Sequence, residues 1–307
     1  MQSVLAADLG GTKCRFALVA EDLSVHGVRQ IATPRQRDAF VAAMDDAFAA
    51  LLAPLPAGVA PPAAIGIGTA GVISTDHRRI EYAPNLPVGG FDLGGHLKTR
   101  HGLPATLLND GRASAMGEYV RGEARGKDPL LVLFFGTGIG IGLVVDGRPY
   151  RGAGNAAGEV GHTIHVPDGL PCPCGRRGCF EAYCGGKPMG LRAAAELGRG
   201  PKEDGSWSVG DVLRAAGDHP AAARILHDAE RAATAMVASL CTLLNPAAVV
   251  LGGGVMGAWP ELFSRIEEGT RQWCSEPVRR GLVFVRSRGG SDAILWGAAA
   301  ATGVFGH

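Results

Sequence analysis

Two stretches of the sequence repeat one pattern, in which an apolar strand meets a glycine turn and continues as a second strand. VLAADLGGTKCRFALVA spans residues 4–20, and LLVLFFGTGIGIGLVVDGRPY spans residues 130–150. Each stretch predicts a β-hairpin with a glycine-rich tip. Helical patterns, a buried strand and a further glycine loop follow in both cases. The repetition predicts an α/β protein of two related halves with a cleft between them.

Helices and strands outside the hairpins are predicted from apolar spacing. Phe40, Met44, Phe48 and Leu51 predict a helix over residues 35–53, and further amphipathic spacing predicts helices over 221–244 and 291–302. The segment ATLLND predicts a strand that ends in two polar residues, and a helix begins at once after it.

The overall composition excludes some partners. The 307 residues carry a net charge of +1, which gives no electrostatic reason to expect a nucleic acid or an anionic membrane. Residues 130–145 are shorter than the roughly 20 residues of a membrane-spanning helix, and no secretory signal is visible. We expect a soluble, cytoplasmic protein.

The glycine tips are candidates for binding phosphate. Glycine lets backbone N–H groups approach an anion closely, and neighbouring hydroxyl and ammonium groups add donors. The third loop, Gly252–Gly254, follows a buried strand and suits a nucleobase or ribose. The alternative is that these glycines only form turns. Neither a Walker-type motif nor a dinucleotide-binding glycine fingerprint is present, so a nucleotide site here belongs to another class.

Asp110 has two interpretations. A carboxylate at the junction of a buried strand and a helix can accept the proton of a substrate hydroxyl that attacks a γ-phosphate. Asp is equally a preferred helix N-cap. Asn109 beside it weakens the second interpretation, because one helix needs only one capping residue.

Three of the seven cysteines lie in the short segment CPCGRRGC. A disulfide framework is not expected in a cytosolic protein. Cys172, Cys174 and Cys179 with His162 form a set that suits a structural, tetrahedral zinc ion. Free thiols are the alternative, and Cys184 competes with His162 for the fourth ligand position. Four protein ligands leave no open position, so the metal would fold the loop rather than catalyse.

With these motifs, the chain resembles the sugar kinases of the ROK family (repressor, open reading frame, kinase) over essentially its whole length. The resemblance rests on DLGGTK at 8–13, LND at 108–110, GTGIG at 136–140, AGEVGH at 157–162, CPCGRRGCFE at 172–181 and LGGGV at 251–255. It departs from the family pattern at Ile141, at Gly111-Arg112 and at Cys184.

The resemblance implies an actin-like ATPase fold (a duplicated ribonuclease H-like fold) with two lobes around a central cleft. The N-terminal lobe would span residues 1–119 with the C-terminal helix 291–307 packed back on it. The C-terminal lobe would span 120–290 and carry the zinc loop. The implied activity is phosphorylation of a hexose 6-hydroxyl by ATP and Mg²⁺, with structural Zn²⁺.

The resemblance also implies roles for individual residues. Asp110 would be the general base. Sugar hydroxyls would be held by Gly71, Asn85, Asn109, Asp110, Glu159, His162 and Glu181. The nucleotide would be held by Asp8, Gly10, Gly11, Thr12, Lys13, Gly136, Thr137, Gly138, Gly252, Gly253 and Gly254. Zinc would be held by His162, Cys172, Cys174 and Cys179.

Two other functions occur in such a family. A sugar-responsive repressor needs a DNA-binding helix-turn-helix, whereas the first phosphate motif here begins at residue 8. A catalytically silent sugar sensor would keep the binding residues without turnover. Among substrates, glucose, N-acetylglucosamine and N-acetylmannosamine remain open. The expected partners are the sugar and ATP, and a homodimer is usual for the family.

Overall fold

The structure is a computed structural model and describes residues 1–306. The chain forms two compact units. Unit 1 comprises Met1–Asp128, Gly142–Gly158 and the chain from Gly289 onward. Unit 2 comprises Pro129–Ile141 and Glu159–Arg288. The predicted division into domains stays a prediction, because a compact unit is not by itself an independently folding one.

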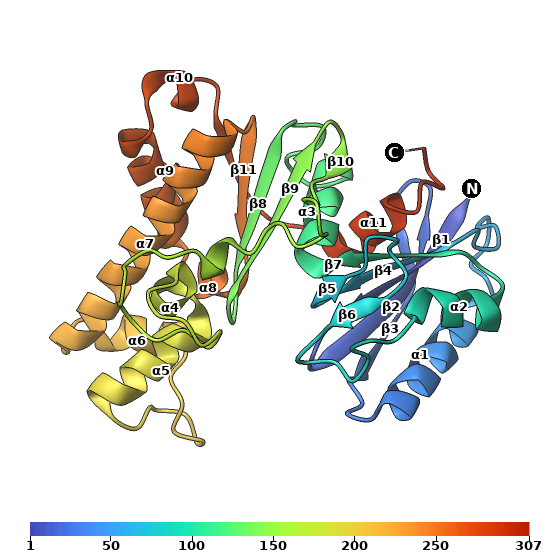
Figure 1. Ribbon diagram of the computed structural model, residues 1–307, viewed down its shortest axis with the longest axis horizontal. Coiled ribbons are helices and arrows are strands. Elements are labelled where there is room, and N and C mark those ends of the chain that lie inside the picture. Colours follow the sequence, from blue (N-terminus) through green and yellow to red (C-terminus); the bar gives the residue numbers. More distant parts are fainter. Residues whose placement is uncertain (307) are drawn as a thin grey trace. The chain divides into compact units, whose positions relative to one another are not determined.

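Unit 1 is built on a five-stranded mixed sheet (Figure 1). β1 (Ser3–Leu9) pairs antiparallel with β2 (Lys13–Ala20) and parallel with β4 (Ile65–Thr69), so the glycine tip at Gly10-Gly11 lies at the same sheet edge as the end of β4. The strands in spatial order are β3 (Val25–Ala32), β2 (Lys13–Ala20), β1 (Ser3–Leu9), β4 (Ile65–Thr69) and β7 (Ala105–Asn109). The predicted first hairpin is therefore confirmed.

Both faces of this sheet are buried, which explains why β1 is apolar at nearly every position. Leu5 and Ala7 pack into the core that contains Phe40 of the helix α1 (Arg37–Leu51), whereas Val4 and Ala6 pack into the core on the other face. Alternate side chains of a strand point to opposite faces, so a strand covered on both faces shows no polar alternation. The remaining elements of unit 1 are α1 (Arg37–Leu51), β5 (Val72–Ile73), β6 (Ile80–Tyr82), α2 (Leu93–His101), α3 (Asp110–Val120) and α11 (Asp292–Ala300).

The C-terminal helix α11 packs closely on α3, and Figure 1 shows the two side by side. A Cβ atom at Gly117 would overlap the carbonyl of Ala293, and one at Gly297 would overlap the carbonyl of Ala113. Glycine at these positions lets the two backbones touch. The last helix of the chain therefore supports the helix that begins at Asp110.

A second five-stranded sheet has three of its strands, β8 (Leu130–Phe135), β11 (Ala248–Gly252) and β12 (Val283–Arg286), in unit 2. β8 pairs parallel with β11, which pairs parallel with β12, and β9 pairs antiparallel with β10. The spatial order is β10 (Arg148–Pro149), β9 (Ile139–Val145), β8 (Leu130–Phe135), β11 (Ala248–Gly252) and β12 (Val283–Arg286). In both sheets, three strands that are consecutive in the sequence are followed by two strands that continue the sheet in parallel. The predicted duplication is confirmed.

The long helix α7 (Pro220–Leu244) is the centre of the helical part of unit 2. Proline at its first position suits a helix start, and Asn245 ends it in the left-handed conformation with a φ of 43°. The other helices are η1 (Val160–His162), α4 (Phe180–Cys184), α5 (Gly186–Leu197), α6 (Val209–Ala215), α8 (Gly254–Ala258), α9 (Glu261–Trp273) and α10 (Glu276–Arg279). Within residues 1–306, no helix combines the length and the apolar character that crossing a membrane requires.

Candidate functional site

The predicted residues of unit 1 gather at one edge of its sheet. Leu9, Thr69 and Asn109 end the parallel strands β1, β4 and β7 and are neighbours in register. The chain beyond these ends contains the Gly10-Gly11 tip, Gly71 and Asp110. In α/β folds, ligands bind outside the carboxyl ends of parallel strands. The topology thus brings together motifs that are about 100 residues apart in the sequence.

Asn109, and not Asp110, caps α3. Its side-chain oxygen accepts hydrogen bonds from the N–H groups of Gly111 at 3.0 Å and Arg112 at 3.4 Å. Its side-chain nitrogen donates to the carbonyl of Gly71 at 3.2 Å. The capping interpretation of Asp110 is therefore wrong. Asn109, which the sequence assigned to the sugar, already makes these structural hydrogen bonds.

Asp110 is the first residue of α3 and is half-buried. Burial raises the pKa of its carboxyl, while a hydrogen bond from the Gly111 N–H at 2.8 Å and the charge of Arg112 oppose that rise. Desolvation disfavours the charged form of an acid and so makes its anion a stronger base. Because the side chain of Asn109 caps α3, the carboxylate of Asp110 is not needed as the N-cap of this helix.

Asp8 is a second perturbed carboxyl in the same unit. Its pKa is raised to about 7, first by burial and next by the negative charge of Asp110, while Arg15 and Lys13 lower it. Arg15 is held in place by an ion pair with Asp292 of α11 at 2.7 Å. Two carboxyls whose environments perturb their titration, at the end of buried strands, are typical of a functional site.

The first glycine tip packs tightly against the segment that carries Asn85. A Cβ atom at Gly11 would lie 2.7 Å from the Asn85 Cβ, which is closer than side chains approach. Asn85, Thr12 and Lys13 are exposed. The structure thus brings Gly10, Gly11, Gly71, Asn109 and Asp110 to one edge, with Asn85 against the tip.

In unit 2, Glu181 supports the second glycine loop. Its carboxylate accepts a hydrogen bond from the Ile139 N–H at 2.9 Å, and a Cβ at Gly138 would overlap it. The first N–H groups of α5, at Gly186 and Lys187, donate to the carbonyls of Gly136 at 2.9 Å and Thr137 at 3.0 Å. The loop is fixed from both sides. Glu181 therefore has a structural contact that the sequence did not reveal.

The third glycine loop lies against the end of β8. Gly252 pairs with Phe134 in the parallel register of β11 and β8. Gly253 has a φ of 97°, and a Cβ there would overlap the carbonyl of Phe135, the residue just before Gly136. Unit 2 therefore has two adjacent glycine loops at the carboxyl ends of two neighbouring strands.

The four predicted zinc ligands form one cluster in the structure. Their ligand atoms all lie within 4.8 Å of one another, and the residues are His162, Cys172, Cys174 and Cys179. Three thiols and one imidazole at this spacing fit a tetrahedral zinc ion. Cys184 lies outside the cluster, and its thiol donates to the carbonyl of Phe180 at 3.3 Å. Of the two candidates for the fourth ligand, the structure favours His162.

Aromatic packing stabilises the cysteine loop. His165 stacks on Phe180 with ring centroids 4.7 Å apart and meets Tyr183 edge-on at 5.3 Å. Tyr183 accepts a hydrogen bond from the Leu170 N–H at 3.0 Å. Glu159 precedes η1 and is exposed. His162 contacts the Sγ of Cys172, and Glu181 accepts the Ile139 N–H. The Glu159 side chain makes no capping hydrogen bond to η1.

Asn155 was not among the predicted residues, although it is only 3% exposed and its side-chain oxygen accepts a hydrogen bond from Arg112 of α3. The available signal was Arg112 itself, a cation in the first turn of a predicted helix, where the helix dipole disfavours it.

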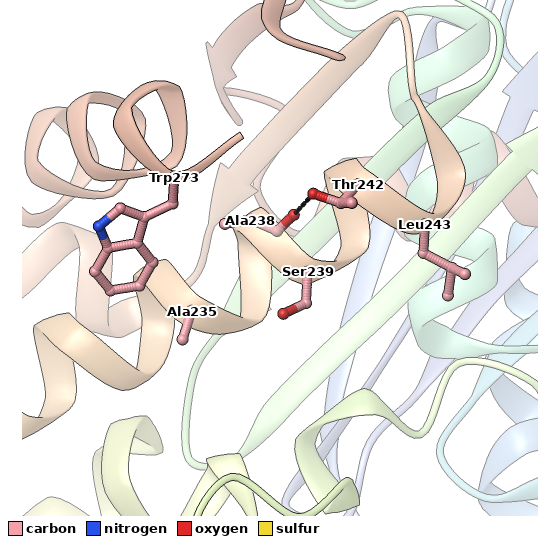
Figure 2. A pocket seen from close by; sticks show the side chains of 6 residues that line it. All are labelled: Ala235, Ala238, Ser239, Thr242, Leu243 and Trp273. Carbon is pink, nitrogen blue, oxygen red and sulfur yellow. Dashed lines mark hydrogen bonds between the residues drawn. The ribbon is translucent and has the colours of Figure 1, made fainter. Parts of the chain in front are cut away.

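A hollow on the surface of α7 contains none of the predicted residues (Figure 2). It has a volume of about 510 Å³ and is lined by Ala235, Ala238, Ser239, Thr242, Leu243 and Trp273. The lining carries no titratable side chain. It is therefore not a candidate for the catalytic site.

Comparison with known proteins identifies the class to which this duplicated α/β fold with a His-Cys₃ loop belongs. Residues 4–302 match the profile of the ROK family, and the chain belongs to that family. The N-acetylmannosamine kinase of Salmonella heidelberg is 31% identical over 300 residues, which cover 97% of each chain.

Two solved structures show the same fold. The ROK hexokinase from Thermus thermophilus has a TM-score of 0.83 and 31% identity, and the match covers 97% of this chain and 96% of that chain. A ROK family glucokinase from Streptomyces griseus, solved in complex with glucose and AMPPNP, has a TM-score of 0.78 and 31% identity. That match covers 97% of this chain and 98% of the other. The predicted fold and family are confirmed.

Proposed function

We propose that the protein is an ATP-dependent hexose kinase that phosphorylates the 6-hydroxyl of glucose or an N-acetylhexosamine. The observation that carries the proposal is Asp110, a half-buried carboxylate with a raised pKa at the end of β7, relieved of capping by Asn109. Family membership and the likeness to a glucokinase that binds glucose and AMPPNP support it.

In this mechanism Asp110 is the general base. Its carboxylate takes the proton of the sugar 6-hydroxyl as that oxygen attacks the γ-phosphorus of MgATP, and ADP leaves. Burial strengthens the base, and the Gly111 N–H keeps one carboxylate oxygen oriented. The other proposed sugar-binding residues are Gly71, Asn85, Asn109, Glu159, His162 and Glu181. The protein would act as a soluble cytoplasmic enzyme, and a homodimer is proposed.

The nucleotide phosphates are assigned to the glycine loops. The first phosphate-binding loop would consist of Asp8, Gly10, Gly11, Thr12 and Lys13. The second would consist of Gly136, Thr137 and Gly138. Gly252–Gly254 are assigned to the adenosine. Backbone N–H groups at positions without a Cβ can approach phosphate oxygens closely.

A zinc ion would be held by His162, Cys172, Cys174 and Cys179. It would supply folding energy to the loop that precedes Glu181, and no step of phosphoryl transfer would pass through it. Because the cluster uses the imidazole of His162, the metal would also fix the orientation of this proposed sugar contact.

The test is ADP release with MgATP and a panel of glucose, mannose, fructose, allose, N-acetylglucosamine and N-acetylmannosamine. Turnover on one sugar is expected, and Asp110→Asn should lower kcat by about 10²–10⁴-fold. Asp22→Asn, an exposed carboxylate elsewhere in unit 1, is the matched control and should keep wild-type activity. Near wild-type turnover of Asp110→Asn would overturn the assignment of the base. Sugar binding without turnover would indicate a sensor instead.

A further inference from the structure

Arg112 is an unusual residue for its position, because it is a buried cation in the first turn of a helix. It follows Asp110 by two residues on α3 and is 4% exposed. The positive end of the helix dipole disfavours a cation there, and burial of a charge is unfavourable without strong partners. Its contacts must therefore offset both effects.

The guanidinium of Arg112 binds one short loop. One nitrogen donates to the side-chain oxygen of Asn155 at 2.6 Å. Another donates to the carbonyls of Asn155 at 3.0 Å and Ala157 at 2.8 Å. A planar fork of donors is well suited to several oxygens at fixed positions. Lysine, with one flexible ammonium group, cannot reproduce this geometry.

Asn155 extends the network to a third segment. Its side-chain nitrogen donates to the carbonyls of Ile73 at 2.9 Å and Ser74 at 3.0 Å. Its φ of 55° is in the left-handed region, which asparagine tolerates better than most residues. Asn155 therefore joins α3 to the end of β5, and its backbone conformation suits glycine as a replacement.

The loop of residues 151–157 is closed on itself and tied at its start. The Ala157 N–H donates to the carbonyl of Arg151 at 3.0 Å. Arg151 donates to the Nε2 of His77 at 2.5 Å. Two residues after Ala157 the chain reaches Glu159, a proposed sugar-binding residue with an exposed carboxylate.

We propose that Arg112 is a positioning residue for the sugar, and that its clamp on Asn155 and Ala157 fixes the loop from which the chain continues to Glu159. The proposal rests on the proposed kinase function. It assigns to one side chain the link between the helix that begins at the base and the segment that leads to a sugar contact.

Arg112 has a second effect that can be separated from the first. Its charge lowers the pKa of Asp110 against the rise caused by burial. The negative charge of Asp110 in turn raises the pKa of Asp8 on β1, which the charges of Arg15 and Lys13 of β2 lower. Arg112→Lys keeps the charge and loses the fork, whereas Arg112→Met loses both.

The first measurement is hydrogen exchange of residues 151–157 in the full-length protein without substrate. Arg112→Met and Asn155→Gly should speed exchange by about 10-fold or more, because hydrogen bonds from a charged donor are lost. Arg148→Met, an exposed arginine of β10, is the matched control and should exchange like wild type. Wild-type exchange in both clamp variants would overturn the proposal.

The second measurement is kinetic. Arg112→Lys, Arg112→Met and Asn155→Gly should each raise KM for the sugar about 10-fold while KM for ATP changes little. Arg112→Met should also move the acid limb of kcat/KM to higher pH, because the pKa of Asp110 rises, and Arg112→Lys should not. Faster loop exchange with an unchanged KM for the sugar would reduce Arg112 to a structural role and overturn the proposal.

The proposed function and this inference can fail separately. If wild-type protein turns over no sugar of the panel, calorimetry with the same sugars replaces the kinetics. Weaker sugar binding in Arg112→Met and Asn155→Gly would then still support the clamp, although the kinase assignment failed. Equal affinity, or no sugar binding by wild type, would overturn the clamp as well. If Arg112→Met does not fold, Arg112→Lys and Asn155→Gly still decide the outcome.

Discussion

The Glu181 carboxylate accepts a hydrogen bond from the backbone N–H of Ile139 at 2.9 Å, so a residue of α4 holds the second glycine loop. Gly138 leaves the space that the carboxylate occupies, since a Cβ there would overlap it. A residue that the sequence assigned to the sugar is thus linked to the proposed phosphate loop. Loss of the acceptor oxygen at residue 181 is therefore expected to affect both substrates.

We expect Glu181→Ala to raise KM for ATP as well as for the sugar. A hydrogen bond to a carboxylate contributes about 1.5–3 kcal/mol, so the change in KM for ATP should be about 10-fold or more. Glu181→Gln keeps an acceptor oxygen and should lie close to wild type for ATP. Steady-state kinetics with each substrate varied in turn measure both. An unchanged KM for ATP in Glu181→Ala would show that the loop does not depend on this contact.

Asp8→Asn should stabilise the protein at neutral and alkaline pH. Because the pKa of Asp8 is raised from 3.8 to about 7, the folded state keeps a proton that the unfolded state has lost between these values. The free energy of unfolding therefore falls as the pH rises from about 4 to about 7. Asparagine does not titrate, so the Tm of Asp8→Asn should exceed that of the wild type most at pH 8, and the difference should vanish near pH 4.

Thermal unfolding between pH 4 and 8 measures this effect, with Asp22→Asn as the control. The pKa of Asp22 is lowered by hydrogen bonds from Ser24, so that variant should show no gain at pH 8. A Tm difference for Asp8→Asn that is the same at pH 4 and pH 8 would contradict the prediction. The stabilised variant should also bind ATP more weakly if Asp8 belongs to the nucleotide site.

Purified protein should contain one zinc ion per chain, and a chelator should lower its Tm. Cys174→Ser removes the exposed ligand of the cluster and should lose the metal, since tetrahedral sites need all four donors. Cys184→Ala should keep it, because this buried thiol bonds to the Phe180 carbonyl outside the cluster. Elemental analysis measures the zinc content of each purified variant. Full zinc content in Cys174→Ser would remove it from the ligand set.

Gly253→Ala and Gly254→Ala separate folding from nucleotide binding in the third glycine loop. Gly253 has a φ of 97° and no room for a Cβ beside the Phe135 carbonyl, so Gly253→Ala should destabilise by about 1–3 kcal/mol. Gly254 has open space around its Cβ position and begins α8. Gly254→Ala should keep the urea midpoint and raise KM for ATP, if the loop holds adenosine. Equal stability of the two variants would contradict this reading of the loop.

Several features of the fold follow directly from the sequence. Buried strands on both sides of a glycine turn predicted both hairpins, and apolar spacing predicted α1, α7 and α11 to within two residues at each end. These patterns are local, since one face or one turn determines them. The His162, Cys172, Cys174 and Cys179 set was also readable, because three of its members lie within eight residues.

Other features could not be read from the sequence, because they depend on contacts between distant segments. Which of Asn109 and Asp110 caps α3 depends on backbone geometry at the strand end, and both residue types are good caps. Asn155 bonds to segments 43 and about 80 residues away, so no spacing rule points to it.

The sequence by itself determined the duplicated α/β pattern, the glycine loops and three members of the His-Cys₃ cluster, because each rests on short-range geometry. Only the tertiary structure decided what the polar residues do. In the folded chain, Asn109 caps α3 and Glu181 accepts the Ile139 N–H. Arg112 donates to Asn155. A polar side chain takes the partners that the folded chain brings within about 3 Å, and those partners are set by packing rather than by residue type.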